Sequence, residues 1–222
     1  MPDPCREAQA LAADAAVLDV ELDSAQQRAL LEFRELLLRW NRAFNLVSRK
    51  DVHRLLPRHL LDSLSVAPWL SGARVLDLGT GAGLPGVPLA IVRRDVAFTL
   101  VDRSARRIRF VRHAARALCL DNVSPWCGDV GALSPGDTFD TVVSRAVAGI
   151  EEVWRLIGGR LSDGGRLLVM HQGQGRGGAP VPGCLPGGCV SKRAWLTIPG
   201  LEQPHELVVI ERRPAGENGD RP

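Results

Sequence analysis

The sequence predicts an α/β fold in which helices cover both faces of a mostly parallel sheet. Two observations support this prediction. Short apolar runs typical of buried strands alternate with longer segments of helical spacing over the middle of the chain. A glycine-rich turn also follows the first of these strands and opens a helix, the place where such sheets bind ligands. The chain has 222 residues, which suits one α/β domain with a small extension.

The composition is that of an ordinary globular protein. Hydrophobic residues make up 45% of the chain and charged residues 24%. The balance of 28 basic and 25 acidic residues gives a net charge of +3, too small to indicate nucleic-acid binding unless the cations cluster. No apolar stretch approaches the roughly 20 residues that cross a bilayer, and the N-terminus has no signal-peptide pattern. We therefore expect a cytoplasmic protein that makes no membrane contact.

The cysteines predict neither disulfides nor a metal centre. There are five of them: Cys5, Cys119, Cys127, Cys184 and Cys189. Cys119 and Cys127 lie in apolar surroundings typical of buried free thiols. Cys184 and Cys189 have no accompanying Cys or His pair that would complete the four ligands of a zinc site. We expect reduced thiols and no bound metal.

The first 70 residues predict a helical extension. Residues 1–20 are rich in alanine, and we expect them to be partly frayed. The expected elements are a helix that begins after Asp23-Ser24 and runs through Trp40, a loop over 41–48, and a second helix over 51–67 that Pro57 kinks or splits.

Residues 71–212 predict the sheet and its helices. Strands are expected at 74–78, 96–101, 123–127, 139–144 and 166–171, and helices at 85–92, 104–120 and 150–161. A flexible Gly- and Pro-rich loop is expected over 173–190, then an antiparallel pair at 194–198 and 207–210. We expect residues 213–222 to form a disordered tail.

The strongest local signal is the turn Asp77-Leu-Gly79-Thr-Gly81-Ala-Gly83-Leu-Pro-Gly86. Its glycines let the backbone turn sharply and approach a ligand closely. From Gly81 onward it matches the dinucleotide fingerprint, and Asp102 lies 21 residues after Gly81, where a ribose-binding acid is expected. The same run is also the acid-x-Gly-x-Gly-x-Gly motif of Rossmann-type methyltransferases. A turn that serves packing alone is a third interpretation.

Residues after the turn favour a methyl donor over a nicotinamide. In that interpretation the turn, with Asp77, Gly79, Gly81, Gly83 and Leu84, cradles the methionine part of S-adenosylmethionine. Asp102 would accept hydrogen bonds from both ribose hydroxyls. Asp129, Val130 and Gly131 follow the third strand, where the adenine amino group is usually contacted, and Arg145 ends the fourth strand. A dehydrogenase would need a proton donor, and His113, His171 and His205 have no partner that the sequence identifies.

Several segments spread over roughly residues 24–212 match the motifs of one known family. They are Trp40-Asn41-Arg-Ala-Phe44-Asn45-Leu-Val-Ser48, Arg58-His59-Leu-Leu-Asp62-Ser63, Asp77-Leu-Gly-Thr-Gly-Ala-Gly-Leu-Pro-Gly86, Thr99-Leu-Val-Asp102-Arg-Ser, Arg107-Ile-Arg-Phe110, Val143-Ser144-Arg145-Ala146 and Leu207-Val-Val-Ile210. In these segments the chain resembles the small-subunit ribosomal RNA guanine-N7 methyltransferases of the G type, also called glucose-inhibited division protein B. The combination is much more specific than a glycine loop alone.

The resemblance implies a Rossmann-type class I methyltransferase fold, with an N-terminal helical cap over 1–70 and a catalytic domain over 71–212. It implies S-adenosylmethionine as cofactor and N7 of a guanine in 16S ribosomal RNA as acceptor, in the 530-loop and decoding region of the small subunit. The implied cofactor contacts are Gly79, Leu84, Asp102, Val130, Gly131 and Arg145. Asn45, Arg58 and His59 would lie near the mouth of the site.

Three positions depart from the family pattern. Gly131 stands where the family often has glutamate, and Gln172-Gly173 where it usually has Lys-Gly. His205-Glu206 stands where it often has Arg-His. The last two departures remove positive charge near the expected site, so they bear on RNA contact rather than on the fold.

The implied chemistry needs little from the protein beyond alignment. Guanine N7 has a free lone pair and no proton at neutral pH, so it can attack the methyl group directly and no general base is required. Alignment of the reacting atoms in line contributes up to roughly 7–11 kcal/mol. We expect Arg145 to orient the cofactor carboxylate or the guanine, the alternative being a structural salt bridge.

Arginines cluster in two segments, which supports an RNA partner. Arg103, Arg106, Arg107, Arg109, Arg112 and Arg116 lie between residues 103 and 120, with no acid among them. Arg34, Arg39, Arg42, Arg49, Lys50, Arg54 and Arg58 lie in the N-terminal helices and the segment between them. Solvated helix faces are the alternative. Trp40 and Phe44 could stack on RNA, although core packing is the more common role of such residues.

Two other functions stay open on the sequence alone. One is an NAD(P)-dependent oxidoreductase, because the dinucleotide spacing is present. The other is an RNA-binding module that has lost its cofactor, against which the intact glycine turn and Asp102 argue. We expect a monomer whose partner is the small ribosomal subunit.

Overall fold

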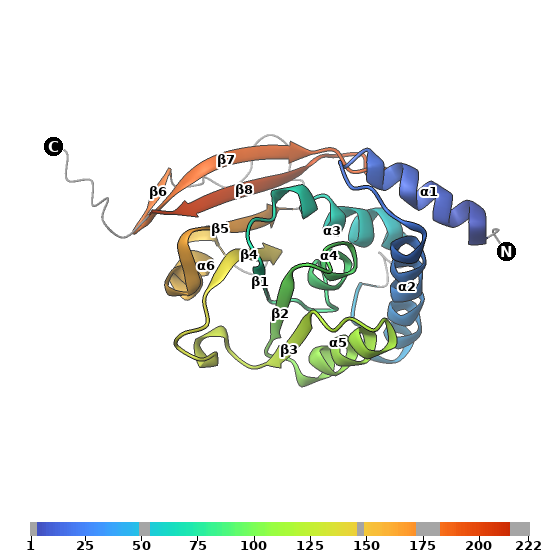
Figure 1. The fold of residues 1–222 in the computed structure, drawn as a ribbon, viewed down its shortest axis with the longest axis horizontal. Helices are drawn as coiled ribbons and strands as arrows, with labels where there is room; N and C mark the ends of the chain where they lie inside the picture. The colour runs from blue at the N-terminus through green and yellow to red at the C-terminus, as the bar shows by residue number, and fades with distance from the viewer. Residues whose placement is uncertain (1–3, 49–53, 146–148, 172–182, 214–222) are drawn as a thin grey trace.

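The computed structural model describes residues 4–48, 54–145, 149–171 and 183–213. At its centre is an eight-stranded sheet with strand order β3-β2-β1-β4-β5-β8-β7-β6 (Figure 1). The first five strands of this order are parallel, and β8, β7 and β6 continue the sheet in antiparallel fashion. The predicted α/β class and the mostly parallel sheet are confirmed.

The strands lie close to their predicted positions. They are β1 Arg74–Leu78, β2 Ala97–Asp102, β3 Val123–Cys127, β4 Phe139–Arg145, β5 Leu161–His171, β6 Cys184–Leu185, β7 Gly188–Leu196 and β8 His205–Arg212. β5 begins five residues earlier than the predicted 166, because Leu161 pairs with Phe139 before a register shift in β4. The expected antiparallel pair is confirmed as β7 and β8.

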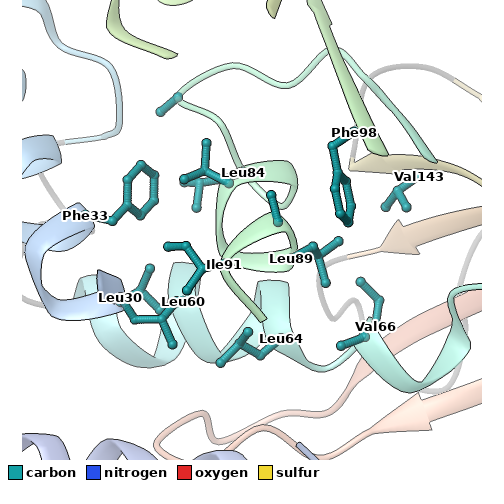
Figure 2. Packing of buried hydrophobic residues seen from close by; sticks show 14 of the residues in the cluster. Leu30, Phe33, Leu60, Leu64, Val66, Leu84, Leu89, Ile91, Phe98 and Val143 are labelled. Carbon is teal, nitrogen blue, oxygen red and sulfur yellow. The ribbon is translucent and has the colours of Figure 1, made fainter. Parts of the chain in front are cut away.

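Side chains alternate between the two faces of the sheet, and each face has its own core. On one face Val75, Phe98 and Val143 join the helices α2 Ser24–Phe44, α4 Gly86–Val92 and α5 Ala105–Ala117. Figure 2 shows Leu30 and Phe33 of α2 on the side of α4 that carries Ile91, and Leu89 of α4 near Phe98 of β2. On the other face Leu76, Val142 and Leu167 pack against α6 Ile150–Ile157. Helices therefore cover both faces, as predicted.

The first helix is ordered against the rest of the protein rather than frayed. α1 spans Pro4–Ala16, and Leu11 and Ala15 are fully buried in the core shared with α2 and the sheet. Glu7 of α1 forms a bidentate ion pair with Arg34 of α2. The prediction of fraying was wrong for this segment because it considered local propensity, whereas tertiary packing stabilises the helix.

The second helix begins where predicted and ends later. The Asp23 carboxylate accepts from the amides of Ala25 and Gln26, and the Gln26 side chain accepts from the Asp23 amide, which forms a capping box. The helix continues through residue 44 and ends at Asn45, which is left-handed with φ of 48°. The loop expected from residue 41 therefore begins at residue 45.

The predicted helix over 51–67 is a series of short turns. Its described part contains η2 Leu56–Leu61, which is a π-helix, α3 Asp62–Leu64 and η3 Ala67–Trp69. Pro57 lies in the first turn of η2, where a missing amide donor costs nothing. Residues 51–53 fall outside the described chain. The expected disruption at Pro57 thus takes the form of a wide helical turn rather than a kink.

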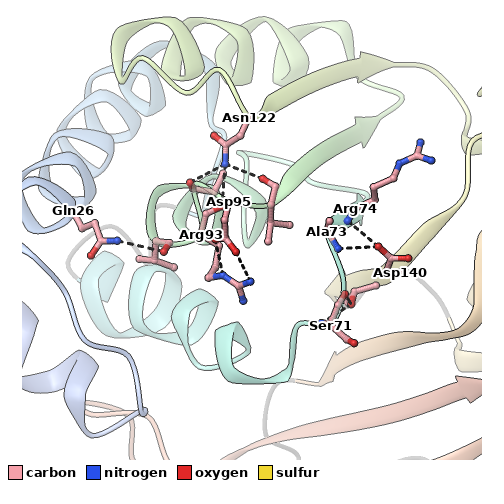
Figure 3. A network of polar contacts seen from close by, with 12 residues as sticks. Gln26, Ser71, Ala73, Arg74, Arg93, Asp95, Asn122 and Asp140 are labelled. Atoms are coloured by element: carbon pink, nitrogen blue, oxygen red, sulfur yellow. Dashed lines mark hydrogen bonds and ion pairs between the residues drawn. The ribbon is translucent and has the colours of Figure 1, made fainter.

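Two polar residues tie the loops at the amino-terminal edge of the sheet. The Asn122 amide donates to the carbonyls of Ala90, Arg93 and Val96 at 3.0–3.1 Å (Figure 3). Asp140 accepts from the backbone amides that begin β1, at 2.9 and 3.0 Å. Burial raises the pKa of Asp140, but the hydrogen bond from Ser162 and these amides lower it, and the net shift is downward.

The Gly- and Pro-rich segment is partly strand, so its prediction as a loop was wrong from residue 184 onward. Cys184 and Cys189 face each other as register partners in the β6–β7 hairpin. The hairpin lies on α6: Trp154 Nε1 donates to the Pro186 carbonyl at 2.9 Å, and a Cβ on Gly188 would lie 2.3 Å from the Trp154 ring. Residues 172–182 and the predicted tail from residue 214 lie outside the described chain.

The cysteines are unpaired in the structure, but two of them are not buried. Cys119 and Cys127 are exposed, in contrast to the prediction of buried thiols. Cys119 lies just after α5 with φ of 51°, and Cys127 ends β3, the outermost strand on its side of the sheet. Within the described ranges no three His, Cys, Asp or Glu side chains gather as metal ligands. No helix of the described part is long and apolar enough to cross a membrane.

Candidate cofactor and RNA site

A cavity of about 530 Å³ opens at the carboxyl edge of the parallel strands. Its wall includes the ends of β1 and β2, the glycine-rich turn, the segment after β3 and Arg145 at the end of β4. This is the edge at which open parallel sheets bind ligands, beside the point where strand order reverses between β1 and β4. The volume lies within the usual range of small-molecule sites.

The glycine-rich turn owes its shape to positive φ angles. Gly81 has φ of 58° and Gly83 has φ of 77°, conformations that residues with a Cβ rarely adopt. The amides of Gly79 and Thr80 both donate to the Val101 carbonyl at 2.9 Å, which joins the turn to β2. Gly79 and Gly81 line the cavity, whereas a Cβ on Gly83 would lie 2.6 Å from Val87 in the core below.

Asp77 supports the turn from beneath. Its Oδ2 accepts from the Thr80 hydroxyl at 2.6 Å and from the Gly86 amide at 2.8 Å. Burial raises the pKa of Asp77 to about 6, although both hydrogen bonds lower it. Its Oδ1 is buried and has no hydrogen-bond partner within the described structure. Asp77 itself does not line the cavity, but Thr80, to which it is bonded, does.

Asp102 is the acid that the spacing predicted, and it lines the cavity at the end of β2. Its carboxylate is 95% buried and accepts from the Gly81 amide at 3.0 Å and the Ser104 amide at 2.8 Å. Arg107 Nη1 lies 3.3 Å from Asp102 Oδ2. A carboxylate offers about four acceptor sites, so capacity remains for the hydroxyls of a bound ribose.

Asp129 and Arg103 form the rim of the cavity near β3. Asp129 accepts from the Gly131 amide at 3.0 Å, and this bond, followed by the one from Arg103, lowers the pKa of Asp129. Val130 lies in the same short turn and contributes an apolar side chain to the lining. Gly131 does not line the cavity, and its amide holds the Asp129 carboxylate that does.

Arg145 is fixed by a buried polar network. Its Nη1 lies 3.3 Å from His59 Nδ1 and 3.6 Å from Asp62 Oδ2, and its side chain is only 16% exposed. Because a guanidinium is a donor only, His59 Nδ1 is the acceptor in this contact. Asp62 Oδ1 also lies 2.7 Å from His205 Nδ1 at the start of β8. The network therefore joins η2, α3, β4 and β8 beside the cavity.

Two further walls come from segments that the sequence did not assign to the site. Leu46 and Val47 follow α2 and line the cavity, and the side-chain Oδ1 of the buried Asn41 accepts from the Val47 amide at 2.9 Å. Glu152 and Leu156 of α6 line the opposite side. No local motif marks these residues, although Asn41 and Val47 lie within the first family segment.

The predicted RNA-contacting residues are dispersed around this cavity. Arg103 and Arg107 line it, and Arg106 is exposed one residue before Arg107. Asn45 is exposed directly before the wall residue Leu46. His59 is 6% exposed, and its contact toward the cavity is the one with Arg145, a residue of the cavity wall. Arg58 is half-buried in the same π-helical turn.

The residues present fit S-adenosylmethionine. The turn brings Gly79, Thr80 and Gly81 into the cavity wall, where backbone atoms can approach the methionine part of a ligand. Asp102 in the cavity wall is suited to ribose hydroxyls, and the buried Oδ1 of Asp77 leaves one acceptor beneath the turn unused. Arg145 supplies a cation for a carboxylate. Apolar residues, including Leu84, Val101 and Val130, complete the lining.

Comparison with known families identifies the chain. The family GidB, rRNA small subunit methyltransferase G, matches residues 26–176. The chain belongs to this family. A relative named ribosomal RNA small subunit methyltransferase G from Methylococcus capsulatus is 41% identical over 87% of this chain and 92% of its own length. Another of the same name from Shewanella amazonensis is 38% identical over 91% of this chain and 98% of its own.

Solved structures agree with the fold at lower identity. The glycopeptide N-methyltransferase MtfA, complexed with S-adenosyl-L-homocysteine, matches 70% of this chain and 87% of its own with a TM-score of 0.56 at 16% identity. A SAM-dependent methyltransferase from Aquifex aeolicus matches 72% of this chain and 92% of its own with a TM-score of 0.52 at 16% identity. These likenesses confirm a Rossmann-like class I methyltransferase fold.

Family membership resolves the two interpretations of the glycine turn in favour of the methyl donor. The family is one of methyltransferases, so the oxidoreductase alternative is not supported. The sequence identified no partner for His205, and the structure pairs this residue with Asp62 from a distant segment. Glu206, which together with His205 departs from the family pattern, is 4% exposed and forms an ion pair with Arg193 of β7. Gln172, another position that departs from the pattern, lies outside the described chain.

Proposed function

We propose that this chain transfers a methyl group from S-adenosylmethionine to N7 of a guanine in 16S ribosomal RNA, in the 530-loop and decoding region. One observation carries the proposal: in a chain of this family, Asp102, the glycine turn and Arg145 line one cavity at the carboxyl edge of the sheet. The relatives' name, which refers to small-subunit ribosomal RNA, supports the choice of acceptor. The cytoplasm is where such a substrate would be met.

S-adenosylmethionine would supply a methyl group on a positively charged sulfur. In the proposed arrangement, Asp102 binds the ribose hydroxyls, Asp129 and Val130 surround the adenine, and the Gly131 amide fixes the Asp129 carboxylate. The turn from Asp77 to Leu84 holds the methionine part, and Arg145 binds its carboxylate or orients the guanine. The apolar walls around Leu46 and Val47 exclude water from the reacting atoms.

The proposed reaction needs no proton to be removed before methyl transfer. Guanine N7 uses its lone pair to form the new bond to carbon, while the bond from carbon to sulfur breaks and its electron pair stays on sulfur. The protein contributes alignment, and the buried pairing of Arg145 with His59 and Asp62 supports this role because it restricts the guanidinium. No residue is therefore assigned the role of a general base.

The target base must leave its stack to reach the cavity, which favours a loop nucleotide. We propose that Arg103, Arg106 and Arg107, with Asn45 and Arg58, contact the RNA around the cavity mouth. In this proposal residues 1–70 act as a cap beside the domain over 71–212. The enzyme would act as a monomer on the small subunit.

The test is transfer of labelled methyl from S-adenosylmethionine to small ribosomal subunits that lack base methylation. Chemical cleavage at 7-methylguanosine then locates the product, and one labelled guanine in the decoding region is the expected result. Thermal stabilisation by S-adenosylhomocysteine but not by NADH is the expected cofactor result. Cofactor binding without transfer to subunits or to naked RNA would overturn the acceptor and leave the cofactor proposal standing.

A further inference from the structure

Helix α5 presents a row of arginines to solvent. Arg106, Arg109, Arg112 and Arg116 are exposed, and the helix contains no acidic residue. Within the described structure none of the four forms an ion pair, whereas Arg103 and Arg107 at the start of the helix pair with Asp129 and Asp102. The row is thus a local excess of positive charge that the rest of the described chain leaves uncompensated.

An aromatic groove lies beside this row. The rings of Trp40 and His113 have centroids 5.2 Å apart, and Arg109 lies over the Phe44 ring at 5.6 Å. Trp40, Arg109, His113, Arg116 and Ala117 line a shallow groove of about 480 Å³. The groove therefore combines π-faces with cations, on a surface formed by the carboxyl-terminal half of α2 and by α5.

The groove is connected to the reaction cavity by one helix. Arg107 lines the cavity and Arg116 lines the groove. The two residues are nine positions apart, which corresponds to about 14 Å along the helix axis. Arg112 is exposed between them. A strand that enters the cavity with one base can follow α5 and reach the groove with a neighbouring part of the same strand.

We propose that the groove lined by Trp40 and His113 binds an unstacked base of the RNA strand that flanks the methylated guanine, with the base on the exposed ring of His113 and Arg109 and Arg116 on the phosphates. This inference rests on the proposed function and adds a second contact to it. Aromatic faces combined with cations are the usual way to bind a single strand without reading its sequence. Duplex RNA would not fit, because its bases are paired and stacked inside the helix.

Three substitutions test the inference. His113→Ala removes the exposed ring, and we expect about tenfold weaker RNA binding, since stacking on one base is worth that much or more. His113→Phe keeps a ring and should restore binding to near the wild-type value. Arg116→Gln should weaken binding and reduce the slope of log K against log salt by about 0.7, the value for one single-strand phosphate contact.

Arg28→Gln is the matched control, because Arg28 is exposed on α2 but lies about 18 Å along the helix from Trp40. All variants are compared by filter binding of unmethylated 16S RNA at several salt concentrations and by methyl transfer to unmethylated small subunits. We expect a higher KM for RNA with unchanged kcat and unchanged cofactor affinity for His113→Ala and Arg116→Gln. Thermal unfolding confirms that each variant is folded.

The two proposals fail in different ways. If the wild-type chain methylates subunits and His113→Ala has wild-type KM and RNA affinity, the groove proposal is wrong and the function stands. If the wild-type chain binds RNA through His113 and Arg116 but transfers no methyl to subunits, the groove stands and the acceptor is wrong. Failure of the wild-type chain to bind RNA at all overturns both.

Discussion

Asp62 and His205 are separated by 143 positions in the sequence, yet Asp62 Oδ1 and His205 Nδ1 lie 2.7 Å apart in the structure. Both side chains are at least 93% buried. The contact joins the helical segment after the amino-terminal helices to β8, the last strand of the described chain. It also fixes the carboxylate whose other oxygen faces Arg145, so a residue far from the glycine turn helps to place a cavity residue.

Asp62→Ala should destabilise the fold by on the order of 3 kcal/mol, because Arg145 and His205 would lose their shared partner inside the protein. The measurement is urea unfolding followed by circular dichroism. Asp121→Ala is the control, since Asp121 is exposed and its side chain forms no hydrogen bond with the residues that the structure describes. Equal stability of the two variants would show that the network contributes nothing to folding.

Arg145→Ala should lower kcat/KM for methyl transfer on the order of a hundredfold while the chain stays folded, because an unaligned reacting group costs about that much. Arg145→Lys should recover only part of the activity, since an ammonium lacks the planar fork of donors. Arg155→Ala, an exposed change on α6, serves as the control. Unchanged turnover and cofactor affinity in Arg145→Ala would show that Arg145 forms a structural salt bridge and does not orient the cofactor or the guanine.

The raised pKa of Asp77 predicts a pH dependence of stability. The folded protein holds the Asp77 proton up to about pH 6, whereas the unfolded chain releases it near 3.8, because burial disfavours the charged carboxylate. Between these values the folded state binds more protons, so the Asp77 contribution to stability is present at low pH and is lost as the pH rises through 6.

Asp77→Asn cannot titrate, so its stability relative to wild type should increase between pH 4.5 and 7, by on the order of 2 kcal/mol. Denaturant unfolding of both proteins across this range measures the difference. A constant difference would contradict the raised pKa. If bound S-adenosylhomocysteine places its ammonium near Asp77, a saturating concentration of this ligand should reduce the pH-dependent difference in stability between the variant and the wild type.

Gly83→Ala should destabilise the protein by about 1–3 kcal/mol, because the residue has φ of 77° and the new methyl group would lie 2.6 Å from Val87. Gly136→Ala should be close to neutral, since a Cβ there meets nothing within 4 Å. Thermal unfolding of the pair measures the contrast. Similar losses for both variants would mean that the turn tolerates a side chain at position 83.

Local patterns predicted the elements whose causes are local. The β1 strand, the glycine turn and the cap residue of α5 are encoded within a few neighbouring positions, and Asp102 was found from its spacing to Gly81. Pattern reasoning failed where distant packing decides the outcome. Leu11 and Ala15 stabilise α1 only because other helices cover them, and β6 exists only because it pairs with β7.

The same distinction applies to the site. Asp102, Arg145 and the glycine turn were predicted because strand ends meet at one edge of a parallel sheet. Leu46, Val47 and Glu152 were missed, because their place in the wall depends on how α2 and α6 dock. The Asp62–His205 contact could not be predicted either, since hydrogen-bond partners so far apart leave no periodic signal in one sequence.

Asn41 joins the last turn of α2 to Val47, and Val47 forms part of the cavity wall. Occupancy of the cavity and integrity of that last turn are therefore thermodynamically coupled. A ligand that binds only when the last turn of α2 is formed must raise the free energy of unfolding that turn. Unfolding of the turn must in return lower the affinity for the ligand by the same factor. Amide hydrogen exchange at the end of α2 would thus report on a site to which it contributes no catalytic group.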